Sequence, residues 1–297
     1  MSLFDLPPEI LLQVFNDVGS DFFQSDISRL TGFEKWKRRG TTCDPQDRER
    51  GRWSNHLNYS LLELAGPMQK SPKLCTLRIR AFSEMNPRDH RVGRRDYLYL
   101  YAVHHLLTAA FLSNLTNLSL DLCGTRLCPR GRQENNEAVK GHTCPLVAGL
   151  LGTLRCLRLR LRRICPDALR PWKHLEGTKL PLEEALVNLS LTNESPLVTA
   201  AGHATRCGGT SVGEFLQRKA DMEAQAHILA TLMATPRKVR ILTHTLPSME
   251  MRAFDVLSGR TMALAEGSDW GDDGEGFEEE VSDEESEISD LSWDDDG

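Results

Sequence analysis

The sequence predicts an α/β chain with a small helical module at its start and an acidic segment at its end. Leucine-rich stretches with period-two alternation recur between residues 74 and 191, and this pattern favours strands. Segments with apolar residues at helical spacing separate these stretches. With 297 residues, of which 40% are hydrophobic, the chain is long enough for a buried core and about two domains.

The first expected element is a helix that starts near Pro8. Proline fits a first helical position, and Glu9 is favourable beside the positive end of the helix dipole. The apolar residues that follow have the spacing of one helix face: Ile10, Leu11, Val14 and Phe15. A helix that ends by Gly19 is too short to be stable alone, so it must pack against a partner.

This start resembles the F-box of fungal F-box proteins, over Leu6-Pro7-Pro8-Glu9-Ile10, Val14-Phe15, Ser25-Asp26-Ile27-Ser28-Arg29-Leu30 and Trp36. In that family the helical module docks on a Skp-family adaptor within a cullin-type ubiquitin ligase, and the following region recruits the substrate. The resemblance implies an adaptor-binding set that comprises Leu6, Pro7, Ile10, Val14, Phe15, Ile27, Leu30 and Trp36. A capped amphipathic helix of another kind could also begin with these residues, and the family pattern is not followed between Gly32 and Lys35.

Changes in composition suggest the domain boundaries. We expect an F-box-like module over 1–38, a basic linker over 39–58, the strand-and-helix body over 59–265 and a disordered acidic tail over 266–297. Sixteen of the 42 acidic residues lie within 266–297, which contains no Lys or Arg. The preceding 265 residues therefore carry 36 basic and 26 acidic residues, a net charge of +10.

Within the body, strands are expected at residues 74–79, 115–123, 154–161 and 186–191, with a weaker candidate at 239–242. Their equivalent leucines are 41, 39 and 32 residues apart: Leu77, Leu118, Leu157 and Leu189. Helices are expected at 59–64, 97–112, 145–151, 182–185 and 212–233. The second of these has an apolar face formed by Ala102, Val103, Leu106, Leu107, Ala110 and Phe111.

The alternation of helices and leucine-rich strands resembles a leucine-rich-repeat solenoid, in which each unit buries its apolar face only by stacking on its neighbours. The repeats of that class run to roughly 20–29 residues, and the units of this chain are longer, so we expect an irregular version. An unrelated α/β domain with leucine-rich parallel strands would give the same pattern.

Residues between the strand leucines are expected on the side of the sheet away from the helices. If the strands stack in order, one row carries Arg78, Ser119, Arg158 and Ser190, the next carries Arg80, Asp121, Arg160 and Thr192, and Arg162 and Arg240 add to the edge. In this arrangement Asp121 would relieve the repulsion between Arg80 and Arg160. Guanidinium forks match carboxylate and phosphate oxygens, so the predicted substrate-binding residues are Arg78, Arg80, Arg158, Arg160 and Arg162. A solvated polar sheet face is the alternative interpretation.

The acidic tail is too polar to bury enough surface to order itself. Apolar side chains spaced within it also allow a docking motif or a fold-back onto the basic body: Trp270, Phe277, Ile288, Leu291 and Trp293. Plain solvation is the other interpretation of this segment.

The eight scattered cysteines are expected to be thiols in a reducing compartment. Cys123-x4-Cys128 and His142-x-Cys144 supply soft ligands, but the second pair lacks the short knuckle of zinc sites, so no metal is predicted. The chain has no phosphate-loop ending and no nucleophile motif, so no cofactor and no catalytic residue is predicted either.

These features predict the non-catalytic substrate-recognition subunit of an SCF-type ubiquitin ligase, located in the cytoplasm or nucleus. The expected partners are a Skp-family adaptor with its cullin complex and an acidic or phosphorylated protein substrate. No membrane partner is expected, because the sequence shows neither a secretory signal nor about 18 consecutive apolar residues. No nucleic acid is expected, because no stacking motif accompanies the basic body. The alternative is a repeat-based interaction scaffold without a ligase role.

Overall fold

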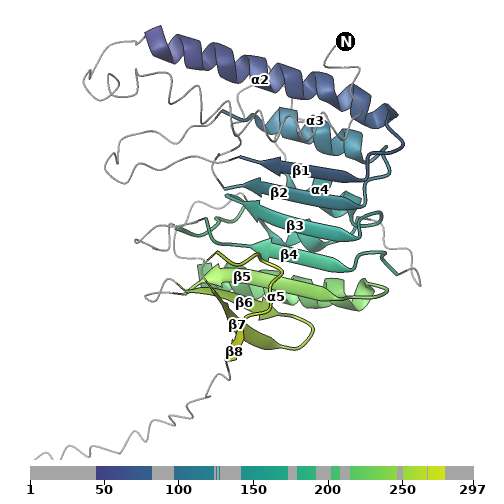
Figure 1. Ribbon diagram of the computed structural model, residues 1–297, viewed down its shortest axis with the longest axis vertical. Coiled ribbons are helices and arrows are strands. Elements are labelled where there is room, and N and C mark those ends of the chain that lie inside the picture. Colours follow the sequence, from purple (N-terminus) through teal and green to yellow (C-terminus); the bar gives the residue numbers. More distant parts are fainter. Residues whose placement is uncertain are drawn as a thin grey trace, which may run out of the picture.

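The computed structural model describes residues 45–81, 97–123, 125, 127, 142–172, 179–191, 202–207, 215–245, 250–265 and 267–277, with side chains from Ser54 onward. Within these ranges the chain has an α/β fold built on an eight-stranded mixed sheet, and the strands lie in the order of the sequence (Figure 1). The predicted F-box-like module, residues 1–38, lies outside the described residues.

The first five strands are parallel: β1 (Thr76–Arg80), β2 (Asn117–Leu122), β3 (Cys156–Leu161), β4 (Glu184–Asn188) and β5 (Lys238–His244). Three antiparallel strands continue the sheet: β6 (Met251–Asp255), β7 (Arg260–Leu264) and β8 (Glu275–Phe277). Parallel neighbours need a crossover connection, which is why helical segments separate β1 to β5 in the sequence.

The helical segments are α2 (Pro45–Lys70), α3 (Leu100–Ala110), α4 (Cys144–Leu150), the 3-10 helix η4 (Pro166–Leu169) and α5 (Phe215–Leu232). Each contacts the next, so they form a row beside the sheet (Figure 1). In α3 the predicted apolar face is confirmed, because Ala102, Val103, Leu106 and Leu107 are all buried.

The core lies between this row of helices and one face of the parallel strands. Leu77, Leu118 and Leu157 are paired across β1, β2 and β3, and each is at most 1% exposed. Full burial of a leucine side chain contributes about 1.5–3 kcal/mol to the stability of the fold. These in-register leucines therefore determine which face of each strand points toward the core. The predicted alternation is therefore confirmed for β1, β2 and β3.

Helix α2 begins inside residues 39–58, which the sequence suggested as a linker, and crosses the boundary expected at residue 59. Within this range the side chain of Asn58 is buried. Its amide donates to the Tyr97 carbonyl at 2.7 Å, and its oxygen accepts the Tyr99 N–H at 2.7 Å. Ser54 also donates to the Tyr97 carbonyl at 2.7 Å, so the second half of α2 is attached to the start of α3.

Strand β4 differs from its prediction. The sequence favoured a helix over 182–185 followed by a strand over 186–191, but the strand is Glu184–Asn188, and Ala185 pairs with Leu157 where Leu189 was expected. The register of β4 against β3 is thus displaced by four residues. An even displacement keeps the same residues on the core face, so Val187 and Leu189 still point inward as part of the core.

Strands β6, β7 and β8 were not predicted. A turn joins β6 to β7, in which Asp255 Oδ1 accepts the Leu257 N–H at 2.9 Å and Gly259 adopts φ 70°. Glycine tolerates this left-handed conformation without steric cost. None of the helices within the described ranges combines the length and the apolar character that a membrane crossing requires.

Candidate functional site

The face of the parallel sheet that points away from the helices carries basic side chains from several strands. The strand register places Arg78, Ser119 and Arg158 side by side, and it continues this row through Leu186 to Arg240. A second row holds Arg80, Asp121 and Arg160. We call this surface the arginine face, and its basic members are Arg78, Arg80, Arg158, Arg160 and Arg240.

Asp121 binds Arg160 in the middle of this face. Arg160 Nε donates to Asp121 Oδ1 and Arg160 Nη2 donates to Oδ2, each at 2.8 Å, so the ion pair is bidentate. The side chains are only 5% and 8% exposed. Partial desolvation lowers the pKa of Arg80 and the neighbouring Arg78 lowers it further, whereas Asp121 raises it. The predicted role of Asp121 as the charge that relieves this row is confirmed.

An acidic segment of the same chain lies across the arginine face. We call residues 267–274, which precede β8, the acidic strap. Arg158 Nη1 donates to both carboxylate oxygens of Asp269, at 2.7 and 2.9 Å. Gly271 lies close to Arg158 and Leu186, so the strap passes over β3 and β4. Charge-assisted contacts of this kind are stronger than neutral hydrogen bonds.

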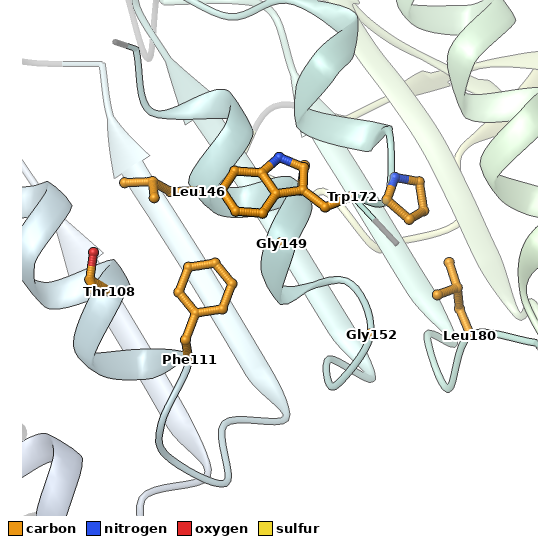
Figure 2. A pocket seen from close by; sticks show the side chains of 9 residues that line it. Thr108, Phe111, Leu146, Gly149, Gly152, Trp172 and Leu180 are labelled. Atoms are coloured by element: carbon orange, nitrogen blue, oxygen red, sulfur yellow. The ribbon is translucent and has the colours of Figure 1, made fainter. Parts of the chain in front are cut away.

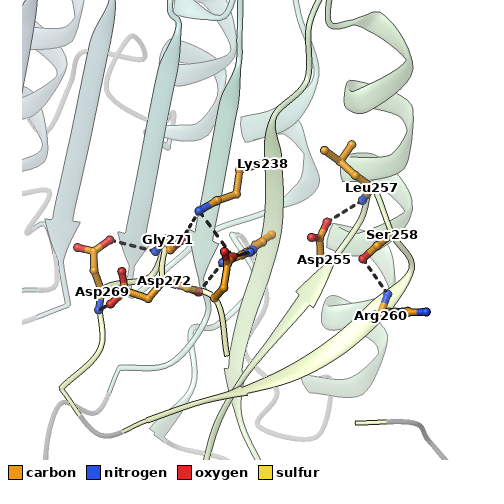
Figure 3. Close-up of polar contacts among 10 residues, drawn as sticks. Lys238, Asp255, Leu257, Ser258, Arg260, Asp269, Gly271 and Asp272 are labelled. Atoms are coloured by element: carbon orange, nitrogen blue, oxygen red, sulfur yellow. Dashed lines mark hydrogen bonds and ion pairs between the residues drawn. The ribbon is translucent and has the colours of Figure 1, made fainter. Parts of the chain in front are cut away.

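The strap makes its remaining polar contacts with β5. Arg240 donates to the Asp272 carbonyl and to Asp273 Oδ1, each at 2.6 Å. Lys238 donates to the Gly271 carbonyl (Figure 3). The hydrogen bond from Arg240 lowers the pKa of Asp273 below its ordinary value of 3.8. This carboxylate contact is therefore fully present above pH 3.8 and is lost only as the pH falls through the lowered pKa.

Trp270 adds an apolar contact to the strap. Its ring lies 5.2 Å from the guanidinium carbon of Arg160, within cation–π range. It also packs against a small cluster formed by Leu242, Ala253 and Leu264. The tryptophan therefore fastens the strap between β3 and the antiparallel strands.

These contacts correct one prediction and support another. The tail was predicted to be disordered over 266–297, and this is wrong for 267–277, which contain the strap and β8. The fold-back onto the basic body is confirmed for the same residues. Residues 278–297, with Ile288, Leu291 and Trp293, lie outside the described part of the chain. The sequence indicated the fold-back only through apolar side chains such as Trp270 and Phe277, spaced within an acidic segment of a chain with a basic body.

The other predicted substrate-binding residues lie where the register places them. Arg78 and Arg80 are exposed on β1, beside the part of the face that the strap covers. Arg162 lies just beyond the end of β3, where its carbonyl accepts the Thr205 N–H at 2.8 Å. The sequence placed Arg240 only at the edge and did not select Lys238, because the strand that carries them gave a weak signal.

Two expected members of the face are not found on it. Ser190 does not join Arg158 in its row; Leu186 takes that place, because the pairing of β4 with β3 is shifted by four residues from the expected register. Ser190 is instead fully buried, and its hydroxyl is hydrogen-bonded to His244 Nδ1. Thr192 lies outside the described residues.

A shallow apolar pocket of about 450 Å³ lies on the helical side of the molecule (Figure 2). Phe111 and Trp172 line it with their rings stacked, 6.2 Å between centroids, and Gly149 forms part of its floor. A Cβ at Gly149 would overlap the Phe111 ring, so the absence of a side chain at this position of α4 leaves room for Phe111, at the end of α3, beside Trp172, which follows η4. None of the described residues that line this pocket is charged, so the pocket does not match the acidic ligand expected from the sequence.

The adaptor-binding residues implied by the F-box resemblance lie outside the described residues: Leu6, Pro7, Ile10, Val14, Phe15, Ile27, Leu30 and Trp36. The arginine face is thus the site that the geometry defines. It can hold a segment of alternating carboxylate and apolar groups, as it does with the strap. No protein-family model, no curated protein and no solved structure matches the chain.

Proposed function

We propose that the protein is the substrate-recognition subunit of an SCF-type ubiquitin ligase and that it binds an acidic or phosphorylated segment of its substrate on the arginine face. The N-terminal resemblance supports the attachment to a Skp-family adaptor. The observation that supports substrate binding at the arginine face is that Asp269 and Asp273 of the same chain already occupy it. On this proposal the body is an irregular leucine-rich-repeat solenoid whose strand face recruits the substrate.

The strap is the internal competitor of this binding. A substrate segment with carboxylate or phosphate groups at similar spacing would pair with Arg158 and Arg240 only after Asp269 and Asp273 had left them. Arg78 and Arg80 are exposed beside the covered part, so an incoming segment can make its first contacts there. The protein would then switch between a closed state and a substrate-bound state.

A non-ligase interaction scaffold would use the same face. The observation that favours this second candidate is that Asp269, Trp270 and Asp273, which bind the arginine face, all come from the strap. On that alternative the first helix would cap the open end of the helical row and would bind no adaptor.

The first test is a pull-down of the full chain with a purified Skp-family adaptor. We expect the wild type to retain the adaptor and Leu6→Ala/Pro7→Ala to lose most of it, because a docking helix needs these apolar contacts. Leu216→Ala is the matched control, since Leu216 is 76% exposed on α5, and it should retain the adaptor. Melting curves complete the test: a double variant that melts earlier and still binds adaptor would support the scaffold and contradict the ligase role.

The second test measures binding to the arginine face by fluorescence anisotropy. The probe is a labelled peptide with the sequence of residues 267–277, added to the strap-neutralised chain, Asp269→Asn/Asp273→Asn. In this background Arg158→Ala should weaken peptide binding by about tenfold or more, because a charge-assisted hydrogen bond contributes roughly 1.5–3 kcal/mol. Arg155→Ala removes an exposed charge next to the same strand and should leave the affinity unchanged. Equal losses in both variants would mean that only net charge matters.

A further inference from the structure

Four potential metal ligands converge at one edge of the parallel sheet. His142, Cys144, Cys165 and Cys207 each offer one ligand atom, and these atoms all lie within 4.8 Å of one another. Cys144 and Cys165 are buried, and His142 and Cys207 are half-buried. The cluster is separate from the arginine face, because none of the four residues contacts the acidic strap in the described contacts.

The topology explains why residues so far apart in sequence meet here. His142 and Cys144 precede β3 in the connection from β2 to α4, Cys165 lies between β3 and η4, and Cys207 lies between β4 and α5. All three connections leave the carboxyl ends of parallel strands, and those ends share one edge of a sheet. The ligands therefore come from three consecutive strand-to-helix connections.

Backbone hydrogen bonds hold two of these connections in register beside the cluster. The Ile164 N–H donates to the Thr205 carbonyl at 3.0 Å, and the Thr205 N–H donates to the Arg162 carbonyl at 2.8 Å. Cys165 follows Ile164 directly, and Cys207 is two residues beyond Thr205. Rigid backbone pairing next to the ligands is what a preformed site requires.

Two of the distances between the ligand atoms are close to those of tetrahedral coordination. Cys144 Sγ and Cys207 Sγ are 3.7 Å apart, and Cys165 Sγ is 3.8 Å from His142 Nδ1. Zinc bonds of about 2.3 Å to sulfur and about 2.0 Å to nitrogen give tetrahedral edges of about 3.8 and 3.6 Å. A disulfide would instead need about 2.05 Å between the sulfurs. The observed spacing therefore suits a central ion.

Hydrogen bonding also prepares the sulfurs for a cation. The Cys165 N–H donates to Cys144 Sγ at 3.4 Å, the kind of outer contact that orients thiolate ligands. A metal ion at the centre would displace the protons of the three thiols.

We propose that His142, Cys144, Cys165 and Cys207 form a structural zinc site that ties three consecutive connections of the parallel sheet together. Three cysteines and one histidine complete a tetrahedron with no open position, which is the composition of structural rather than catalytic zinc. The sequence led to the opposite expectation, because it paired His142-x-Cys144 with Cys123 and Cys128. The partners are Cys165 and Cys207 instead, 21 and 63 residues beyond Cys144, and no local motif indicates them.

The test uses the full-length chain without an affinity tag, purified under reducing conditions without chelator. Mass spectrometry of the metal content should find one zinc ion per chain. After removal of the metal, titration with cobalt(II) should produce the visible bands of tetrahedral thiolate coordination, and added zinc should abolish them. Loss of the metal should also lower the melting temperature by several degrees, because the ion binds only the folded chain.

Cys207→Ser and His142→Ala test the ligands at half-buried positions, where the substitutions disturb packing least. Each should lower zinc affinity by at least about tenfold. Cys156→Ser is the matched control, since this half-buried thiol lies on β3 outside the cluster and should leave zinc binding intact. A chain without zinc and without the cobalt spectrum would overturn the proposal, as would a Cys144–Cys207 disulfide or unchanged zinc affinity in both ligand variants.

Discussion

Asp121→Ala is expected to destabilise the protein by about 3–5 kcal/mol, because it removes the carboxylate that binds Arg160 through two hydrogen bonds while the guanidinium stays buried. The two side chains are 5% and 8% exposed, so water cannot take over the role of Asp121. The repulsion between Arg160 and the neighbouring Arg80 would also be left without compensation. Equilibrium unfolding in urea measures the change directly.

An exposed ion pair provides the control for this prediction. Arg237→Ala breaks a 3.3 Å contact with Glu183 in which the arginine is 73% exposed, and pairs of this kind contribute only about 0–1 kcal/mol. The double variant Asp121→Leu/Arg160→Met removes both buried charges and should recover much of the loss, since a buried ion pair is often replaceable by apolar residues of similar volume. If Asp121→Ala lowers the free energy of unfolding by no more than Arg237→Ala does, then Asp121 does not stabilise the protein by compensating the buried charge of Arg160.

The sequence was sufficient to predict the strands whose apolar pattern is compatible with only one register. In β1, β2 and β3 the leucines alternate with polar residues, and only one register buries all of them against the helices. The same alternation correctly put Arg158, Arg160 and Asp121 on the opposite face. Period-two patterns predict strand faces well, because a strand slipped by one residue would turn its arginines toward the apolar core.

For β4 the apolar pattern is compatible with two registers. Ala185, Val187 and Leu189 occupy every second position, so either Ala185 or Leu189 could pair with Leu157 of β3. The larger Leu189 suggested the wrong register. Tertiary contacts determine the register, because the backbone of Leu189 forms hydrogen bonds with Leu242 and Ala204 and not with β3. Local sequence does not encode that competition.

The acidic strap was difficult to predict for a different reason. Composition alone makes 266–297 a solvated segment, and two strands that flank the strap, β7 and β8, have few leucines to mark them. What orders the strap is complementarity with residues more than 30 positions away, as in the contacts of Asp273 with Arg240 and of Asp269 with Arg158. Charge patterns of separate segments indicate such a contact only once the fold is known.

Neutralising the strap is expected to raise the affinity of the arginine face for an acidic peptide by about tenfold or more. Asp269 and Asp273 hold Arg158 and Arg240 in the closed chain, and a competitor within the same chain acts at a millimolar effective concentration. If the face is open in one molecule in ten, the apparent dissociation constant is about ten times the intrinsic one, and Asp269→Asn/Asp273→Asn removes this factor. Fluorescence anisotropy with the labelled peptide of residues 267–277 measures the apparent dissociation constant of both chains.

Two further variants separate release of the strap from a general change in charge. Glu275→Gln/Glu278→Gln removes the same number of charges but leaves Asp269 and Asp273 in place, so the affinity should stay at the wild-type value. Gly274→Ala keeps every charge, yet its Cβ would overlap the Ala263 carbonyl where the strap enters β8, so it should release the strap and raise the affinity. An increase in the first variant, or none in the second, would show that the strap does not compete for the face. Because the two variants change charge and backbone separately, only competition by the docked strap predicts both results.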